Sequence, residues 1–190
     1  MIDPQYWNIE RTAGLILVLS AVTTFPGFMM FWQRRGHRGG PPRSHAHWVF
    51  ERSSIMSGVI IIAIGFMLLE GAFQTTDGRV LANIGATAYF FGGVLLVAAE
   101  ALMLTRGYEK VYSLVVIYVV MAFLAQAAIG GAVIQSGLLA AWIGWATILW
   151  NIAWLVVLSL ISRRDMYFPI LHYLMPLVMG IALLLGIPSL

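Results

Sequence analysis

The sequence predicts an all-α protein, a polytopic bundle of about six transmembrane helices with both termini outside the cell. Three observations support this fold class. Of the 190 residues, 61% are hydrophobic and only 10% are charged, a composition far from that of soluble globular domains. The hydrophobic residues form six runs, each long enough to cross ~30 Å of hydrocarbon as a helix. Nine of the eleven Lys and Arg residues lie in alternate connections between these runs, as the positive-inside rule expects.

The six runs span residues 13–32, 54–73, 80–104, 111–136, 138–161 and 168–187. None of them alternates apolar and polar residues as the strands of a membrane barrel do. A helix also satisfies its own backbone hydrogen bonds in lipid. The tight connections around Asp77 and Gly137 predict that the second run packs antiparallel to the third, and the fourth to the fifth. Little chain is left for anything else, so we predict one integral membrane domain over residues 1–190.

The basic residues set the predicted orientation. Nine of them lie in segments 33–52, 105–110 and 162–165, and only Arg11 and Arg79 lie elsewhere. A cytoplasmic location for these segments places both termini outside and predicts a basic cytoplasmic loop over residues 33–53. Glycines and prolines within 34–43 argue against a regular helix there. We therefore expect a multi-pass protein of the plasma membrane, with the lipid bilayer as its surroundings and no nucleic acid as a partner.

Small residues predict close packing between the helices. They are concentrated in segment 125–132, and they recur at Gly85, Ala86, Gly92 and Gly93. Helix association in lipid depends on such close backbone contact rather than on hydrophobic burial. We expect a packed bundle rather than six separate spans.

Glu100 and His172 are the most distinctive ionisable pair. Each is expected about one turn inside the cytoplasmic face, Glu100 in the third span and His172 in the sixth. Ionisable groups within a membrane are costly, and they often mark functional sites. The pair could relay a proton, or the two side chains could bond each other for structural reasons alone. We predict a direct or water-bridged contact between them, and both roles stay open.

Two prolines predict helix kinks. Pro176 removes the backbone donor for the carbonyl of His172, and Pro26 does the same for Val22. Each freed carbonyl needs another partner. Discontinuous helices often line transporter sites, although prolines in membrane helices also serve packing alone.

Three further polar residues lie within the spans, and two of them, Gln126 and Asn151, are expected near mid-membrane. Gln126 is in the fourth span, and Thr147 and Asn151 share a helix face of the fifth at i,i+4 spacing. They could form hydrogen bonds between helices that fix the packing register, or they could line a polar cavity.

The sequence contains no recognisable catalytic chemistry. It has no cysteine, which excludes disulfides, thiolate nucleophiles and Cys-ligated metals. His37, His45 and His47 lack a carboxylate at a recognised metal-ligand spacing, so a solvated basic loop is expected there. We predict no catalytic residues, no metal site and no cofactor site, and the identity of any cofactor stays unknown.

Segments 137–145 and 172–180, together with 10–17 near the start, resemble the corresponding parts of uncharacterised bacterial membrane families of six helices. The match covers about half the chain. Those families have no assigned activity. The resemblance therefore implies a bacterial membrane protein and a helical bundle, without a function.

These observations favour a non-catalytic protein, a structural or accessory subunit that packs in the bilayer alone or within a larger membrane complex. The alternative is a small-molecule or ion/proton-coupled transporter. Six helices are few for a transporter, so that alternative requires a homo-oligomer. An intramembrane enzyme is the third class, but it needs a nucleophile or a metal set that the sequence lacks.

Overall fold

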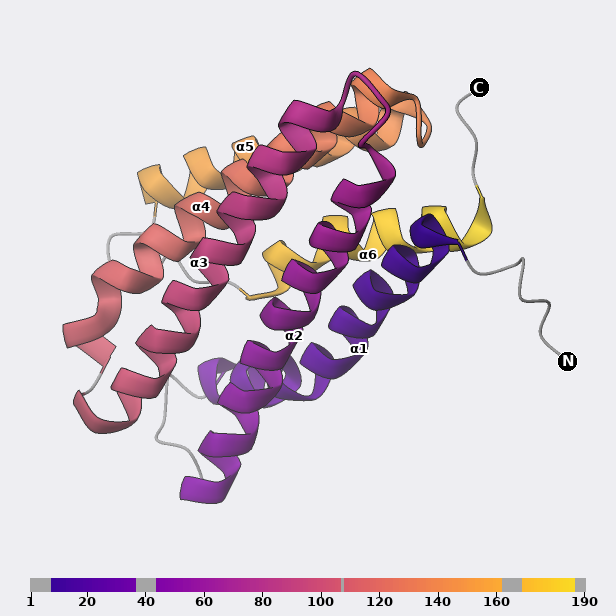
Figure 1. Ribbon diagram of the computed structural model, residues 1–190. Helices are drawn as coiled ribbons and strands as arrows, with labels where there is room; N and C mark the ends of the chain where they lie inside the picture. Colours follow the sequence, from indigo (N-terminus) through magenta and orange to yellow (C-terminus); the bar gives the residue numbers. More distant parts are fainter. Residues whose placement is uncertain (1–7, 37–43, 107, 162–168, 187–190) are drawn as a thin grey trace, which may run out of the picture.

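A computed structural model of the chain describes residues 8–36, 44–106, 108–161 and 169–186, and every regular element in these ranges is an α-helix. Figure 1 shows the helices running side by side as a bundle. They are α1 (Ile9–Gly36), α2 (His45–Ala72), α3 (Arg79–Arg106), α4 (Tyr108–Ser136), α5 (Ala141–Ile161) and α6 (Pro169–Leu185). The predicted all-α fold class is confirmed.

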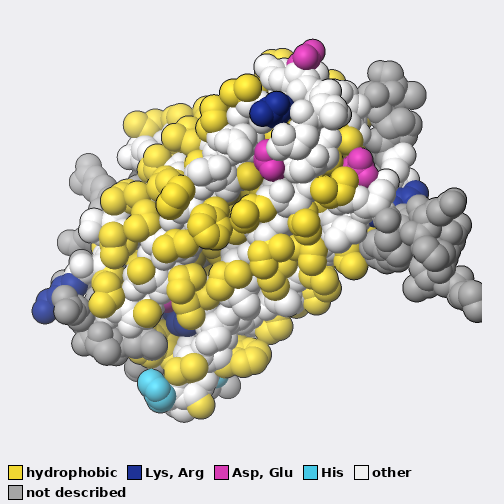
Figure 2. All heavy atoms as spheres, viewed as in Figure 1, with side chains coloured by type: hydrophobic (Ala, Val, Ile, Leu, Met, Phe, Trp, Pro, Cys, Tyr) yellow, Lys and Arg dark blue, Asp and Glu magenta, His cyan; other side chains and the backbone are white. Residues whose placement is uncertain are grey.

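The bundle has the dimensions and surface of a membrane protein. Five helices, α1 to α5, are long and apolar enough to cross a bilayer. The sixth is also apolar but has only 17 residues, so it is about 26 Å long at 1.5 Å per residue. On the face shown in Figure 2, hydrophobic side chains cover the middle, and most charged side chains gather toward the two ends. This distribution matches a hydrocarbon belt between two polar interfaces.

The helices pack one against the next in the order α6, α1, α2, α3, α4, α5. The most extensive contacts join α1 to α2 and α3 to α4, followed by α4 to α5 and α1 to α6. The helices α5 and α6 follow each other in sequence but touch little. Gly14 and Gly180 lie where α1 meets α6: a Cβ on either glycine would be 2.8 Å from the carbonyl oxygen of the other. The helix α6 therefore packs beside α1 rather than beside α5, which precedes it in the sequence.

The helix starts differ from the sequence prediction, and capping explains where they fall. Asn8 caps α1, since its Oδ1 accepts a hydrogen bond of 2.9 Å from the backbone N–H of Arg11. Ser44 caps α2 in the same way, with a bond of 3.1 Å from the His47 N–H. The Ser44 cap places residues 45–53 in α2. Residues 33–36 belong to α1, against the expectation of irregular structure there, so the predicted loop over 33–53 is shorter than expected. Residues 37–43 lie outside the described part.

The turn between α4 and α5 displaces the predicted start of the fifth span. Gly137 follows α4 with a φ of 65°, and its N–H donates to the Val133 carbonyl at 3.2 Å. This left-handed residue is a common helix C-cap, and glycine adopts it without strain. The chain then needs residues 138–140 to reverse direction, so α5 begins at Ala141 rather than at residue 138.

Small residues do bring helix backbones together, as the sequence predicts. A Cβ on Gly130 of α4 would lie 2.8 Å from the carbonyl oxygen of Gly144 in α5. A Cβ on Gly85 of α3 would lie 2.8 Å from the carbonyl oxygen of Ala125 in α4. Close contact of this kind gives dispersion energy and permits short interhelical hydrogen bonds.

Candidate functional site

Side chains of α4 and α5 donate to the backbone of α6 beside its proline. Because Pro176 has no N–H, the carbonyl of His172 lacks its usual donor within the helix. The Nε2 of Gln126 in α4 supplies one, at 3.0 Å. The neighbouring Leu171 carbonyl accepts a bond of 3.0 Å from the indole Nε1 of Trp150 in α5. The expectation that the freed carbonyl finds another partner is thus confirmed for α6.

The His172 ring is enclosed by aromatic side chains. It stacks on Phe123 of α4, with ring centroids 4.5 Å apart and planes inclined by 30°. Tyr118, also of α4, lies 5.3 Å away at 33°. Only 1% of His172 is exposed. The imidazole therefore contributes to the α4–α6 interface as a flat ring between other rings.

A side chain of α2 forms hydrogen bonds with the backbone of α1 beside Pro26. Pro26 removes the donor for the Val22 carbonyl, and the next i,i+4 pair along the helix is Thr23 and Gly27. Ser54 of α2 bonds both groups of that pair: its hydroxyl donates to the Thr23 carbonyl at 2.5 Å and accepts from the Gly27 N–H at 3.1 Å. Both prolines lie inside continuous helices, and beside each one a polar side chain from a neighbouring helix bonds the backbone.

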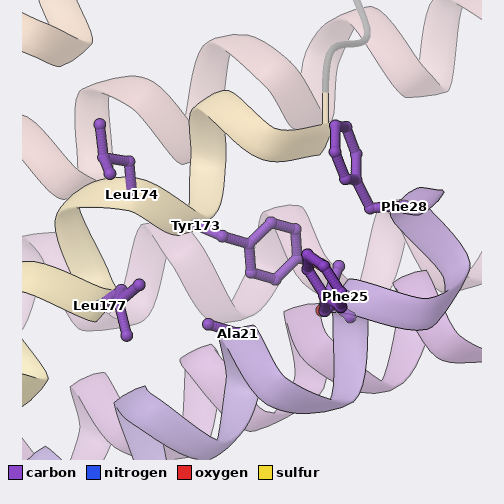
Figure 3. Close-up of a pocket in the computed structure, with 7 residues that line it drawn as sticks. Ala21, Phe25, Phe28, Tyr173, Leu174 and Leu177 are labelled. Carbon is purple, nitrogen blue, oxygen red and sulfur yellow. The ribbon is translucent and has the colours of Figure 1, made fainter. Parts of the chain in front are cut away.

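A pocket lies between α1 and α6, beside both prolines. Its volume is about 190 Å³. In Figure 3, Ala21 of α1 lies opposite Leu177 of α6, and the Tyr173 ring reaches from α6 toward Phe25 of α1. The seven lining residues are Ala21, Thr24, Phe25, Phe28, Tyr173, Leu174 and Leu177. The pocket is therefore formed by the segments that the two prolines interrupt.

Charged residues are buried where α2 packs on α3. Arg52 of α2 donates from Nη1 to Glu100 Oε1 of α3 at 3.2 Å, and its Nε is 3.4 Å from Glu51 Oε1. The guanidinium also lies 5.8 Å from the centroid of the Phe31 ring. Glu51 is 0% exposed and Glu100 is 3% exposed. Pairing offsets the cost of placing these charges in a low-dielectric interior.

The polar residues of α5 bond mainly along their own helix. Thr147 Oγ1 donates to the Ile143 carbonyl, and Asn151 Nδ2 donates to the Thr147 carbonyl, each at 2.8 Å. Both residues are fully buried. The Oδ1 of Asn151 has no hydrogen-bond partner among the described residues. The predicted shared face of Thr147 and Asn151 is present, and both of these hydrogen bonds stay within α5.

The structure brings together some of the predicted residues and separates others. Gln126, His172 and Pro176 form one group, whereas Glu100 pairs with Arg52. The contact predicted between Glu100 and His172 stays a prediction. Glu100 pairs with Arg52, and the His172 ring stacks on an aromatic ring of α4.

Sequence reasoning missed three contributors to these sites: Arg52, Ser54 and Trp150. The Ser44 cap was the signal that would have extended the second span backward and placed Arg52 in a helix. Ser54 was already the first residue of that predicted span, but its partner on α1 was not predicted. Trp150 carried no comparable signal, because an indole in an apolar run is expected in any membrane helix.

No metal-binding group is found in the described ranges, in which no three His, Asp or Glu residues are close enough to hold an ion. His45 and His47 lie in the first turn of α2, and His37 lies outside the described residues. Comparisons with known protein families, with curated protein sequences and with solved structures find no match to this chain.

Proposed function

We propose that the chain is a non-catalytic structural or accessory subunit of a larger membrane complex, in the plasma membrane of a bacterium. One observation supports this above others: polar side chains within the spans bond to backbone carbonyls of neighbouring helices. Gln126, Ser54 and Trp150 each do so. Such bonds fix how helices pack and leave those donors unavailable to a substrate.

The integral membrane character itself follows from the apolar helices. A subunit of this kind contributes a rigid, correctly shaped surface rather than reactive groups. The tight glycine contacts between α4 and α5 and between α1 and α6 favour rigidity, since packed interfaces resist continuous deformation.

Purification from native membranes in a gentle detergent tests the proposal. The tagged chain should migrate as a hetero-complex with at least one other membrane protein at fixed stoichiometry. The matched control is the same tagged chain from a foreign host, where it should migrate alone at a lower mass. Identical migration from the two hosts, with no stoichiometric companion, would rule out the accessory role.

The second candidate is an ion- or proton-coupled transporter acting as a homo-oligomer. The buried Arg52–Glu100 pair favours it, because charges inside membrane helices often mark ion pathways. Glu100 Oε2 is buried and has no hydrogen-bond partner among the described residues.

A flux assay in proteoliposomes tests this second candidate. An imposed pH gradient should drive proton flux into or out of the vesicles, and Glu100→Gln should abolish that flux. The matched control is Glu70→Gln, since Glu70 is only part-buried at the far end of α2 and bonds Gln74. Equal flux in protein-free vesicles would exclude the transporter.

A further inference from the structure

The pocket between α1 and α6 has a hydrocarbon lining. Five of its residues, Ala21, Phe25, Phe28, Leu174 and Leu177, carry no polar side-chain atom. Its volume of about 190 Å³ exceeds the ~150 Å³ of an engineered apolar cavity in another protein that stays dry and binds benzene. A void of this size would leave the surrounding side chains without partner atoms and would forfeit their dispersion energy. An apolar occupant is therefore favoured.

The two hydroxyl groups of the lining already donate elsewhere. Tyr173 donates to the Ile55 carbonyl of α2 at 2.8 Å, and Thr24 donates to the Ser20 carbonyl of its own helix at 2.8 Å. Neither proton is available to a ligand carbonyl or phosphate. The pocket thus suits an alkyl chain better than a polar head group or a quinone ring, whose oxygens need donors.

The pocket opens toward lipid. Phe25 at its edge is 61% exposed, and the adjacent Val22 is 60% exposed on the surface of an apolar membrane helix. The last turn of the same helix, which ends at Gly36, contains Arg34 and Arg35. Phe28 precedes Arg34 by six positions, which is about 9 Å along a helix. Basic residues at this location attract anionic lipid head groups.

We propose that this pocket is a lipid-binding site for one acyl chain of an anionic phospholipid. The lipid comes from the leaflet on the side of Arg34 and Arg35. The chain fills the space between Ala21 and Leu177, and the head group lies at the arginine end of α1. This site is independent of the proposed subunit role, since neither the accessory nor the transport function requires it.

Photo-crosslinking in nanodiscs tests the site. The purified protein is reconstituted with a trace of phosphatidylglycerol or phosphatidylcholine that carries a diazirine in one acyl chain. Adducts are then mapped by mass spectrometry. Pocket peptides should label more strongly with phosphatidylglycerol than with phosphatidylcholine. They should also label more strongly than the exposed apolar positions Leu149 and Val156 of α5, which are 63% and 50% exposed.

Two variants separate the pocket from ordinary boundary lipid. Ala21→Phe places a ring in the pocket and should lower its labelling about tenfold, the change that a loss of roughly 1.4 kcal/mol in binding produces. Val22→Phe adds a ring at the neighbouring lipid-facing position and should leave labelling unchanged. Replacing Arg34 and Arg35 together by Gln should remove the preference for phosphatidylglycerol and keep the signal from phosphatidylcholine.

The wild-type protein alone tests the site, through labelling of the pocket compared with α5 and through the two lipids, even if Ala21→Phe does not fold. Pocket labelling no stronger than that of α5 would show boundary lipid only and would overturn the site. Equal labelling by the two lipids would overturn the anionic head group. In a folded Ala21→Phe protein, unchanged labelling would likewise overturn the acyl-chain position.

Discussion

The side-chain amide of Gln126 donates a hydrogen bond of 3.0 Å to the backbone carbonyl of His172. That carbonyl is the one that Pro176 deprives of its helical donor. A polar residue near mid-membrane in α4 therefore completes the backbone of α6. The bond links two helices that otherwise make few contacts.

This relationship predicts a coupling between Gln126 and Pro176. Gln126→Leu leaves the buried His172 carbonyl without a donor and should destabilise the protein by about 1 kcal/mol. In a Pro176→Ala background the helix regains its own N–H, and Gln126→Leu should then cost much less. A double-mutant cycle of unfolding in SDS titrations measures the difference. Equal costs in the two backgrounds would mean that the bond does not compensate for the proline.

Ser54 offers a parallel test at the other proline. Ser54→Ala removes the hydroxyl that bonds the Thr23 carbonyl and the Gly27 N–H of α1. The free energy of unfolding should fall by about 1 kcal/mol. Ser57→Ala is the matched control, because the Ser57 hydroxyl donates to the Ser53 and Ser54 carbonyls of its own helix. A comparable loss in both variants would assign the effect to serine removal in general.

The buried ion pair predicts an order of stability. Arg52→Met leaves Glu100 buried without its cation and should cost about 3–5 kcal/mol, as breaking a buried pair does. Glu100→Gln should cost less, since the amide oxygen still accepts from the guanidinium, and Glu100→Leu should fall between them. Adding Glu100→Gln to Arg52→Met should recover part of the loss. Thermal unfolding in detergent measures all four proteins, and the absence of recovery would refute the pairing.

The orientation of the bundle predicts a labelling pattern. Single cysteines are informative because the chain has none of its own. A cysteine at His45 should resist an impermeant maleimide in intact cells, because the basic side is predicted to be cytoplasmic. A cysteine at Thr76, in the turn between α2 and α3, should react. Reaction at position 45 with protection at position 76 would invert the topology.

The sequence predicted the six-helix fold because hydrophobic length and basic-residue asymmetry are properties of whole segments, each averaged over many positions. It also predicted that Pro176 frees the His172 carbonyl, since that rule depends only on the local backbone. The donor, Gln126, is 46 residues away in sequence. Which side chain reaches the gap depends on how α4 and α6 rotate against each other, and no local pattern encodes that rotation.

The predicted loop position of Arg52 was wrong, because it was inferred from the charge of the residue. Glu51 and Arg52 were placed in a solvated loop because charged residues are expected outside the hydrocarbon region. In the structure they are buried, since each charge has a partner of opposite sign on its own or the adjacent helix. A pairing of this kind spans two helices and is visible only once α2 and α3 are packed.

The contact of α1 with α6 also has a consequence for biosynthesis. These two helices are separated by roughly 130 residues. At typical elongation rates of ~5–20 residues per second, α1 reaches the bilayer on the order of 10 s before α6. During that interval the face of α1 around Gly14 lacks its α6 partner, so it must be covered by lipid, by the insertion machinery or by a chaperone. The α1–α6 contact can therefore form only after α6 has left the ribosome.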